Sequence, residues 1–270
     1  MIALSFLPPQ SLTQLRRALA APHHVVSVPA WEQLTACVRE RTCDVIVVDP
    51  CAGAERFAGE RVRELVTARG RAPATPVIGY VSVTAAAIHA VRSLVRACDA
   101  EIVVRGVDDG ADALLRTLQR SIAGSGAEPL VNVAFDAPLM PLPPEIAEAI
   151  ALLFRRPDKL RSVDDLATAA NTTRRTLDRW LARAGLASAR TLLACARVSA
   201  AFHLLSAGGV RTRSAAALLG YASPRALSRE LQWLAGFGPS AVPGHMTHAA
   251  LVDALRPRLF RAPSAAEPSY

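Results

Sequence analysis

The fold is decided by two stretches that follow the same pattern, DLATAANTTRRTLDRWLARAG from Asp165 to Gly185 and RTRSAAALLGYASPRALSRELQWLAGFGPSAV from Arg211 to Val242. Aligned on each other, they place Asn171 on Gly220, so the pattern repeats after about 50 residues. In each copy a short helical pattern leads to a residue that tolerates a left-handed backbone, and a second helical pattern follows. The sequence therefore predicts an internal repeat of two helices joined by a tight turn.

The second helix of each copy has one apolar and one polar face. Thr173 and Ser223 are predicted N-caps, because a hydroxyl at that position accepts a hydrogen bond from a backbone N–H of the first turn. Leucines at helical spacing, including Leu177 and Leu227, predict the buried face. The opposite face carries side chains suited to base edges and phosphates. Together with the caps, the candidate DNA-contacting residues are Thr173, Arg174, Arg175, Asp178, Arg179, Ser223, Arg225, Ser228, Arg229 and Gln232.

This region resembles the DNA-binding domain of AraC/XylS-type transcription regulators. The strongest part is LLGYASPRALSRELQWLAGFGPSAV, Leu218 to Val242, with a glycine-aromatic turn and a late G-x-x-P-S. The segment ACARVSAAFHLL, Ala194 to Leu205, looks like the helix that connects the two helix-turn-helix units of that family. The resemblance implies an all-α, double helix-turn-helix domain that binds double-stranded DNA in two successive major grooves.

The first 124 residues alternate between strand and helix patterns. Five short apolar runs, MIALSFL, HHVVSVP, CDVIVVDP, PVIGYVSV and EIVVRGV, are separated by amphipathic segments. This alternation predicts an α/β domain with a doubly wound parallel sheet, in a flavodoxin-like strand order. The pattern resembles a response-regulator receiver, because Asp49 closes the third strand where receivers hold the phosphoryl acceptor. Ser82 and Arg105 follow the fourth and fifth strands, where receivers have a hydroxyl and a lysine.

The receiver resemblance lacks the acidic pair that would hold a metal ion. Leu7, Pro8 and Pro9 stand where carboxylates would bind Mg²⁺ and offset the phosphoryl charge. We therefore expect a pseudo-receiver that serves for dimerisation or partner contacts, with Asp49 capping the loop after its strand. The alternative is a phosphorylation-controlled response regulator in which Asp49 is the acceptor.

Four segments follow from these patterns. The expected organisation is a receiver-like domain at 1–124, a proline-containing linker at 125–142, an AraC-type DNA-binding domain at 143–245, and an extra helix and tail at 246–270.

The charge of the chain is concentrated in its second part. Of the formal +8, residues 1–124 carry +2, from 14 basic and 12 acidic residues, and the remainder carries +6, from 17 basic and 11 acidic residues. A basic excess beside the repeat favours a phosphate-rich partner. We expect double-stranded DNA as that partner, and a homodimer formed through the N-terminal domain. An architectural DNA binder without sequence preference is less favoured, because Asp178, Ser228 and Gln232 add polar variety to the candidate recognition faces.

Other classes find little support in the sequence. The five cysteines form no C-x-x-C pair, so we expect a reduced, cytoplasmic protein without a metal or other cofactor. Neither a secretory leader nor a long uncharged apolar run is apparent, so we expect no membrane contact. Motifs of hydrolases, zinc proteases and nucleotide-binding loops are missing too, and we expect no enzymatic activity and no catalytic residues.

Overall fold

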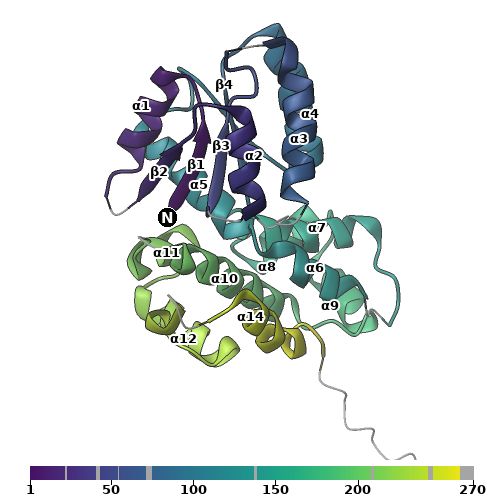
Figure 1. Ribbon diagram of the computed structural model, residues 1–270. Helices are drawn as coiled ribbons and strands as arrows, with labels where there is room; N and C mark the ends of the chain where they lie inside the picture. Colours follow the sequence, from purple (N-terminus) through teal and green to yellow (C-terminus); the bar gives the residue numbers. More distant parts are fainter. Residues whose placement is uncertain are drawn as a thin grey trace, which may run out of the picture. The chain divides into compact units, whose positions relative to one another are not determined.

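The computed structural model describes residues 1–21, 23–40, 43–53, 55–70, 75–136, 139–207, 210–242 and 246–261 (Figure 1). The chain forms two compact units. The first consists of Met1–Ser125 together with Ala207 and Val210, and the second consists of Gly126–Ser206 and the described residues from Arg211 onward. No helix in the described ranges combines the length and the apolar character needed to cross a bilayer.

The first unit is built on a five-stranded, all-parallel sheet. Its strands are β1 (Ile2–Phe6), β2 (His24–Ser27), β3 (Val45–Val48), β4 (Val77–Val81) and β5 (Glu101–Val104). Their order is β2-β1-β3-β4-β5, which is the order found in flavodoxin-like sheets. The predicted α/β class and its parallel sheet are confirmed.

Helices cover both faces of this sheet. Successive strand residues point to opposite faces, so Val45 and Val47 pack with Leu114 and Leu118, whereas Ile46 belongs to the core on the other side. The first face is covered by α1 (Pro9–Ala18) and α5 (Ala111–Gly124), and the second by α2 (Trp31–Glu40), α3 (Ala58–Arg69) and α4 (Ala85–Cys98) (Figure 1). A short 3-10 helix, η1 (Glu55–Phe57), precedes α3. Burial on both sides explains why the strands are continuous apolar runs.

The second unit is helical. Its elements, in chain order, are α6 (Ala127–Asp136), α7 (Pro144–Arg155), α8 (Val163–Ala169), α9 (Arg174–Arg183), α10 (Ala189–Ser206), α11 (Thr212–Leu218), α12 (Pro224–Ala235), η2 (Pro239–Ala241), α14 (His248–Leu255) and η3 (Arg256–Arg258). The central helix is α10, which contacts α6, α7, α8, α9, α11, α12 and η3. Its buried residues include Leu192, Val198 and Leu204.

The expected linker at 125–142 differs from the structure. Most of it is helix α6, which packs on α7 and buries Ala127, Leu130, Val131 and Ala134. Those positions follow helical spacing, and Pro129 lies in the first turn, where its missing N–H breaks no helical hydrogen bond. This segment is therefore part of the helical unit and not an irregular connection. The tail expected after Arg261, residues 262–270, lies outside the described residues.

Candidate nucleic-acid interface

The second unit contains two helix pairs, and the same kind of turn connects the two helices of each pair. In the first helix pair, α8 and α9, Asn171 adopts φ 47°, and in the second helix pair, α11 and α12, Gly220 adopts φ 75°. The N–H of Thr172 donates to the carbonyl of Ala167 at 2.9 Å, and the N–H of Tyr221 donates to that of Ala216 at 2.9 Å. Both turns thus end the first helix with the Schellman hydrogen-bond pattern. The repeat in the sequence is a repeat in backbone geometry.

The caps of the second helices also match. The hydroxyl of Thr173 accepts from the N–H of Thr176 at 3.2 Å, and that of Ser223 accepts from Ala226 at 3.2 Å. The second pair has one more residue, Ala222, between its turn and its cap. Each cap satisfies a backbone N–H that the helix itself leaves without a partner.

The leucine faces of α9 and α12 point inward. Leu177, Leu181, Leu227 and Leu231 are each at most 1 % exposed. Helical spacing then turns the opposite side of each helix outward. Of the predicted contact residues, those that the structure leaves exposed are Thr173, Arg174, Arg175, Asp178, Arg179, Arg225, Arg229 and Gln232, whereas Ser223 and Ser228 are half-buried.

Several predicted contact residues already form a hydrogen bond or an ion pair within their own helix pair or its C-terminal cap. The hydroxyl of Ser228 donates to the carbonyl of Pro224 at 3.0 Å, and the amide of Gln232 donates to the carbonyl of Gly236 at 3.0 Å. Arg174 pairs with Asp164 at 3.4 Å between two exposed side chains, and such a pair is weak. All of these groups can exchange their partners at little cost when a ligand arrives.

Among the predicted contact residues, four exposed arginines have no ion pair within the described residues. They are Arg175, Arg179, Arg225 and Arg229. Their guanidinium groups carry five donors each and remain charged at any physiological pH. They place cationic hydrogen-bond donors on the outward side of the two second helices.

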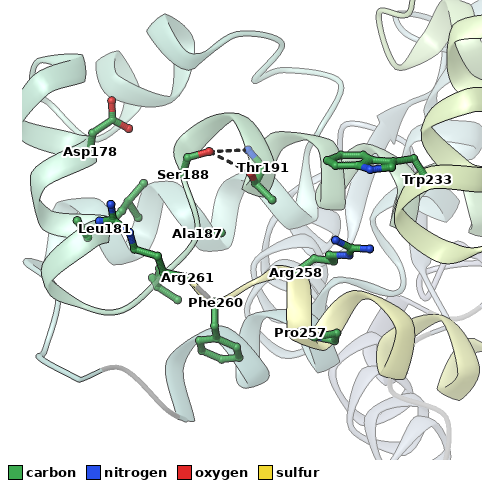
Figure 2. A pocket seen from close by; sticks show the side chains of 12 residues that line it. Asp178, Leu181, Ala187, Ser188, Thr191, Trp233, Pro257, Arg258, Phe260 and Arg261 are labelled. Carbon is green, nitrogen blue, oxygen red and sulfur yellow. Dashed lines mark hydrogen bonds between the residues drawn. The ribbon is translucent and has the colours of Figure 1, made fainter. Parts of the chain in front are cut away.

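A recess between the two helix pairs was missed by the sequence analysis. It holds about 570 Å³ and is lined by α9, the start of α10, the end of α12 and the residues after α14 (Figure 2). Trp233 forms one wall and is 62 % exposed, and the guanidinium of Arg258 lies 5.7 Å from its ring centroid. Trp180 on α9 is half-buried, and the guanidinium of Arg183 lies 5.5 Å from its ring centroid. The one visible trace of the recess in the sequence is the pair Arg258 and Arg261 in the run RPRLFR, residues 256–261.

The side chains of Cys195 and Tyr221 lie near Glu230 of α12, and burial suppresses the ionisation of both. Burial raises the pKa of the Cys195 thiol to about 12, and the nearby Glu230 carboxylate adds to this rise. Burial also raises the pKa of Tyr221, whose ring lies 5.7 Å from the guanidinium of Arg197. At neutral pH Cys195 stays a thiol, which is a poor nucleophile, and the cluster serves as packing under the second pair.

In the first unit, the loop after β3 holds the candidate phosphoacceptor. Asp49 is 4 % exposed, and its Oδ1 accepts from the N–H of Cys51 at 2.9 Å. Arg61 fixes the same loop by donating to the carbonyls of Pro50 and Ala52 at 2.9 and 2.7 Å. The Asp49 carboxylate thus caps the loop after its strand, as one of the two interpretations of Asp49 expects.

The residues that accompany Asp49 in the receiver pattern lie after the neighbouring strands. Ser82 follows β4 with its hydroxyl buried and lacking a hydrogen-bond partner among the described residues. After β5, the backbone N–H of Gly106 lowers the pKa of Asp109, and so do the hydrogen bond from Tyr80 Oη at 2.8 Å and the charge of Arg105. The charge of Arg105 thus stabilises the ionised carboxylate of Asp109.

Comparison of the chain with protein-family profiles, with curated proteins and with solved structures found no match. What the chain does is therefore inferred from its own residues and their geometry.

Proposed function

We propose that the chain is a sequence-specific DNA-binding transcription regulator of the AraC/XylS type, with the two helix pairs acting as two helix-turn-helix units. The carrying observation is that both pairs have the same turn and cap, and both expose arginines on the second helix. In such units the second helix enters the major groove. Two N–H groups of an arginine guanidinium can donate to guanine O6 and N7 at once, and this bidentate contact favours guanine over other bases by about 1–3 kcal/mol.

The test is binding by the full chain to duplexes selected from a random pool. We expect a protected site that spans two successive major grooves, whose centres lie about 34 Å apart. Arg225→Ala or Arg229→Ala weakens one half of the site, and Arg174→Ala or Arg175→Ala weakens the other.

Each of these four substitutions is expected to reduce affinity for the selected site by roughly 5- to 150-fold, if the arginine reads a base. A matched control is Arg155→Ala on α7, which removes one exposed charge and its 2.7 Å ion pair with Glu128 but lies on neither second helix. Protection of a single groove face, or four variants that bind like the parent, would refute the two-unit interpretation.

We further propose that the receiver-like unit is a non-phosphorylated contact module that forms a homodimer. Its loops after β4 and β5 expose Val83 and Val107, at 80 % and 74 %, and α4 exposes Ile88 and Val95, at 57 % and 44 %. Aliphatic side chains exposed on neighbouring elements favour a protein contact, and two tandem sites on DNA favour a dimer through effective concentration.

Sedimentation of the full chain tests the dimer. We expect a dimer that Ile88→Asp converts to a monomer, while Val26→Asp, at an exposed aliphatic position on the opposite edge strand β2, leaves the dimer intact. A parent chain that stays monomeric at high concentration would contradict the dimer.

A further inference from the structure

One side of the recess between the two helix pairs is formed by the segment after α14, which is hydrogen-bonded to the turn before α10. Phe260 forms an antiparallel bridge with Leu186, the N–H of Ala187 donates to the carbonyl of Leu259 at 2.9 Å, and the N–H of Arg261 donates to that of Gly185 at 2.9 Å. Leu259 is fully buried. The backbone on either side of this leucine is thus pinned to the turn that precedes α10.

This pinned segment presents two cations to the recess. Arg258 and Arg261 both line it and are both exposed, and Figure 2 shows Arg258 beneath the ring of Trp233. The contact with the indole restricts the Arg258 side chain, which lowers the entropy lost when it binds an anion.

The rest of the lining is suited to a phosphate-bearing ligand with apolar parts. Ser188 caps α10 by accepting from the N–H of Thr191 at 3.2 Å, and the two hydroxyls lie 2.9 Å apart. Trp233 offers a large apolar wall. The single carboxylate of the lining is Asp178, on the outward side of α9. Cations, hydroxyls and an apolar wall together match the sugar-phosphate chain of a nucleic acid.

The position of the recess identifies the part of the duplex that meets it. When two helices occupy successive major grooves, the stretch between them presents a minor groove bordered by two sugar-phosphate strands. The recess lies between α9 and α12, since Asp178 lines one side and Trp233 the other. Backbone contacts fix the register of a protein on DNA without reading the sequence.

We propose that this recess seats the sugar-phosphate backbone of the DNA segment between the two major-groove contacts, with Arg258 and Arg261 as phosphate-binding residues. The inference rests on the proposed function, because it requires that the two helix pairs bind one duplex.

Salt dependence of binding by the full chain tests the proposal. The logarithm of the binding constant falls with the logarithm of salt concentration by about 0.9 for each phosphate neutralised. Arg258→Ala and Arg261→Ala are each expected to reduce this slope by about 1, and to weaken selected and random duplexes by the same factor. Arg258→Lys keeps the charge and is expected to keep the slope.

The control is Arg256→Ala, because Arg256 is exposed and lies in the same 3-10 helix as Arg258 but does not line the recess. Its slope is expected to equal that of the parent. Tryptophan emission gives a second readout, and the change caused by DNA is expected to shrink in Trp233→Phe.

The outcomes separate the two proposals. Parental salt slopes in both alanine variants, or a loss confined to the selected sequence, would overturn the backbone seat while the DNA-binding function stands. An unchanged emission response in Trp233→Phe would also overturn it. A parent chain that binds no duplex at all would overturn the proposed function itself.

Discussion

Replacing Gly126 with alanine is expected to destabilise the helical unit, because the added methyl group would overlap a buried ring. Gly126 precedes α6 and lies against the ring of His203 on α10. A Cβ at this position would lie 1.6 Å from Nε2 of His203 and 2.5 Å from the two adjacent ring carbons. His203 has little room to retreat, since its ring centroid lies 4.8 Å from that of His248 and 5.5 Å from that of Phe202.

The magnitude follows from two opposing effects. Overpacking of a filled interior costs about 1–3 kcal/mol, and the depth of this overlap favours the upper half of that range. Alanine also restricts the unfolded chain more than glycine does, which raises the free energy of unfolding by about 0.4–1 kcal/mol. We therefore expect a net loss of about 2 kcal/mol in the free energy of unfolding, measured from the urea midpoint at constant m value.

Two controls isolate the steric cause. Gly238→Ala, in the same unit, places its Cβ in open space at a negative φ and is expected to change stability by less than about 0.5 kcal/mol. In a double-mutant cycle, Gly126→Ala is expected to cost much less when His203 is already alanine. Equal costs in both backgrounds, or a Gly126→Ala variant as stable as Gly238→Ala, would refute the overlap argument.

Three further outcomes are expected. Burial lowers the pKa of His203 to about 3, so below about pH 6.5 the unfolded state binds a proton that the folded state does not. The contribution of neutral His203 to stability is therefore complete above about pH 6.5 and falls by about 1.4 kcal/mol for each pH unit below it. Urea midpoints measured from pH 7.5 to 5 should fall more steeply in the parent than in His203→Leu. Thr173→Ala and Ser223→Ala each remove an N-cap and should lower the free energy of unfolding by about 1 kcal/mol, and a loss near zero would show that the caps are dispensable. Mg²⁺ with acetyl phosphate should leave DNA affinity unchanged in the parent and in Asp49→Asn, whereas a phosphodonor-dependent gain that is lost in Asp49→Asn would restore the response-regulator alternative.

The parallel sheet could be predicted because its signal is local. A strand covered on both faces must be apolar at every position, and runs such as VIVV, residues 45–48, are short enough to exclude most helices. The turns of the two helix pairs can be predicted equally well, because the chain reversal needs a residue that adopts a left-handed backbone, such as Asn171 or Gly220. In each case the residues that make the structure are neighbours in the sequence.

Features that depend on distant residues escaped prediction. The recess combines α9, α12 and a segment after α14, and no local pattern links Trp233 with Arg258. Trp233 also lies between Leu231 and Leu234, so the apolar pattern alone left its exposure undecided. Helix α6 is hard to predict for a different reason: prolines are typical of loops, but Pro129 lies in the first turn of the helix, where proline is compatible with helical structure.

The antiparallel bridge between Leu186 and Phe260 has a consequence for the order in which the protein matures during synthesis. Helices α8 to α12 are complete once residue 235 has been translated, but their closing partner, Leu259, is made later. Until Leu259 and Phe260 leave the ribosome, the turn before α10, with its buried Leu186 and Ala187, lacks this bonding partner. The nascent helical unit thus passes through an interval in which apolar side chains of this turn are accessible to chaperones, and a chain truncated within α14 would lack the residues that close this seam.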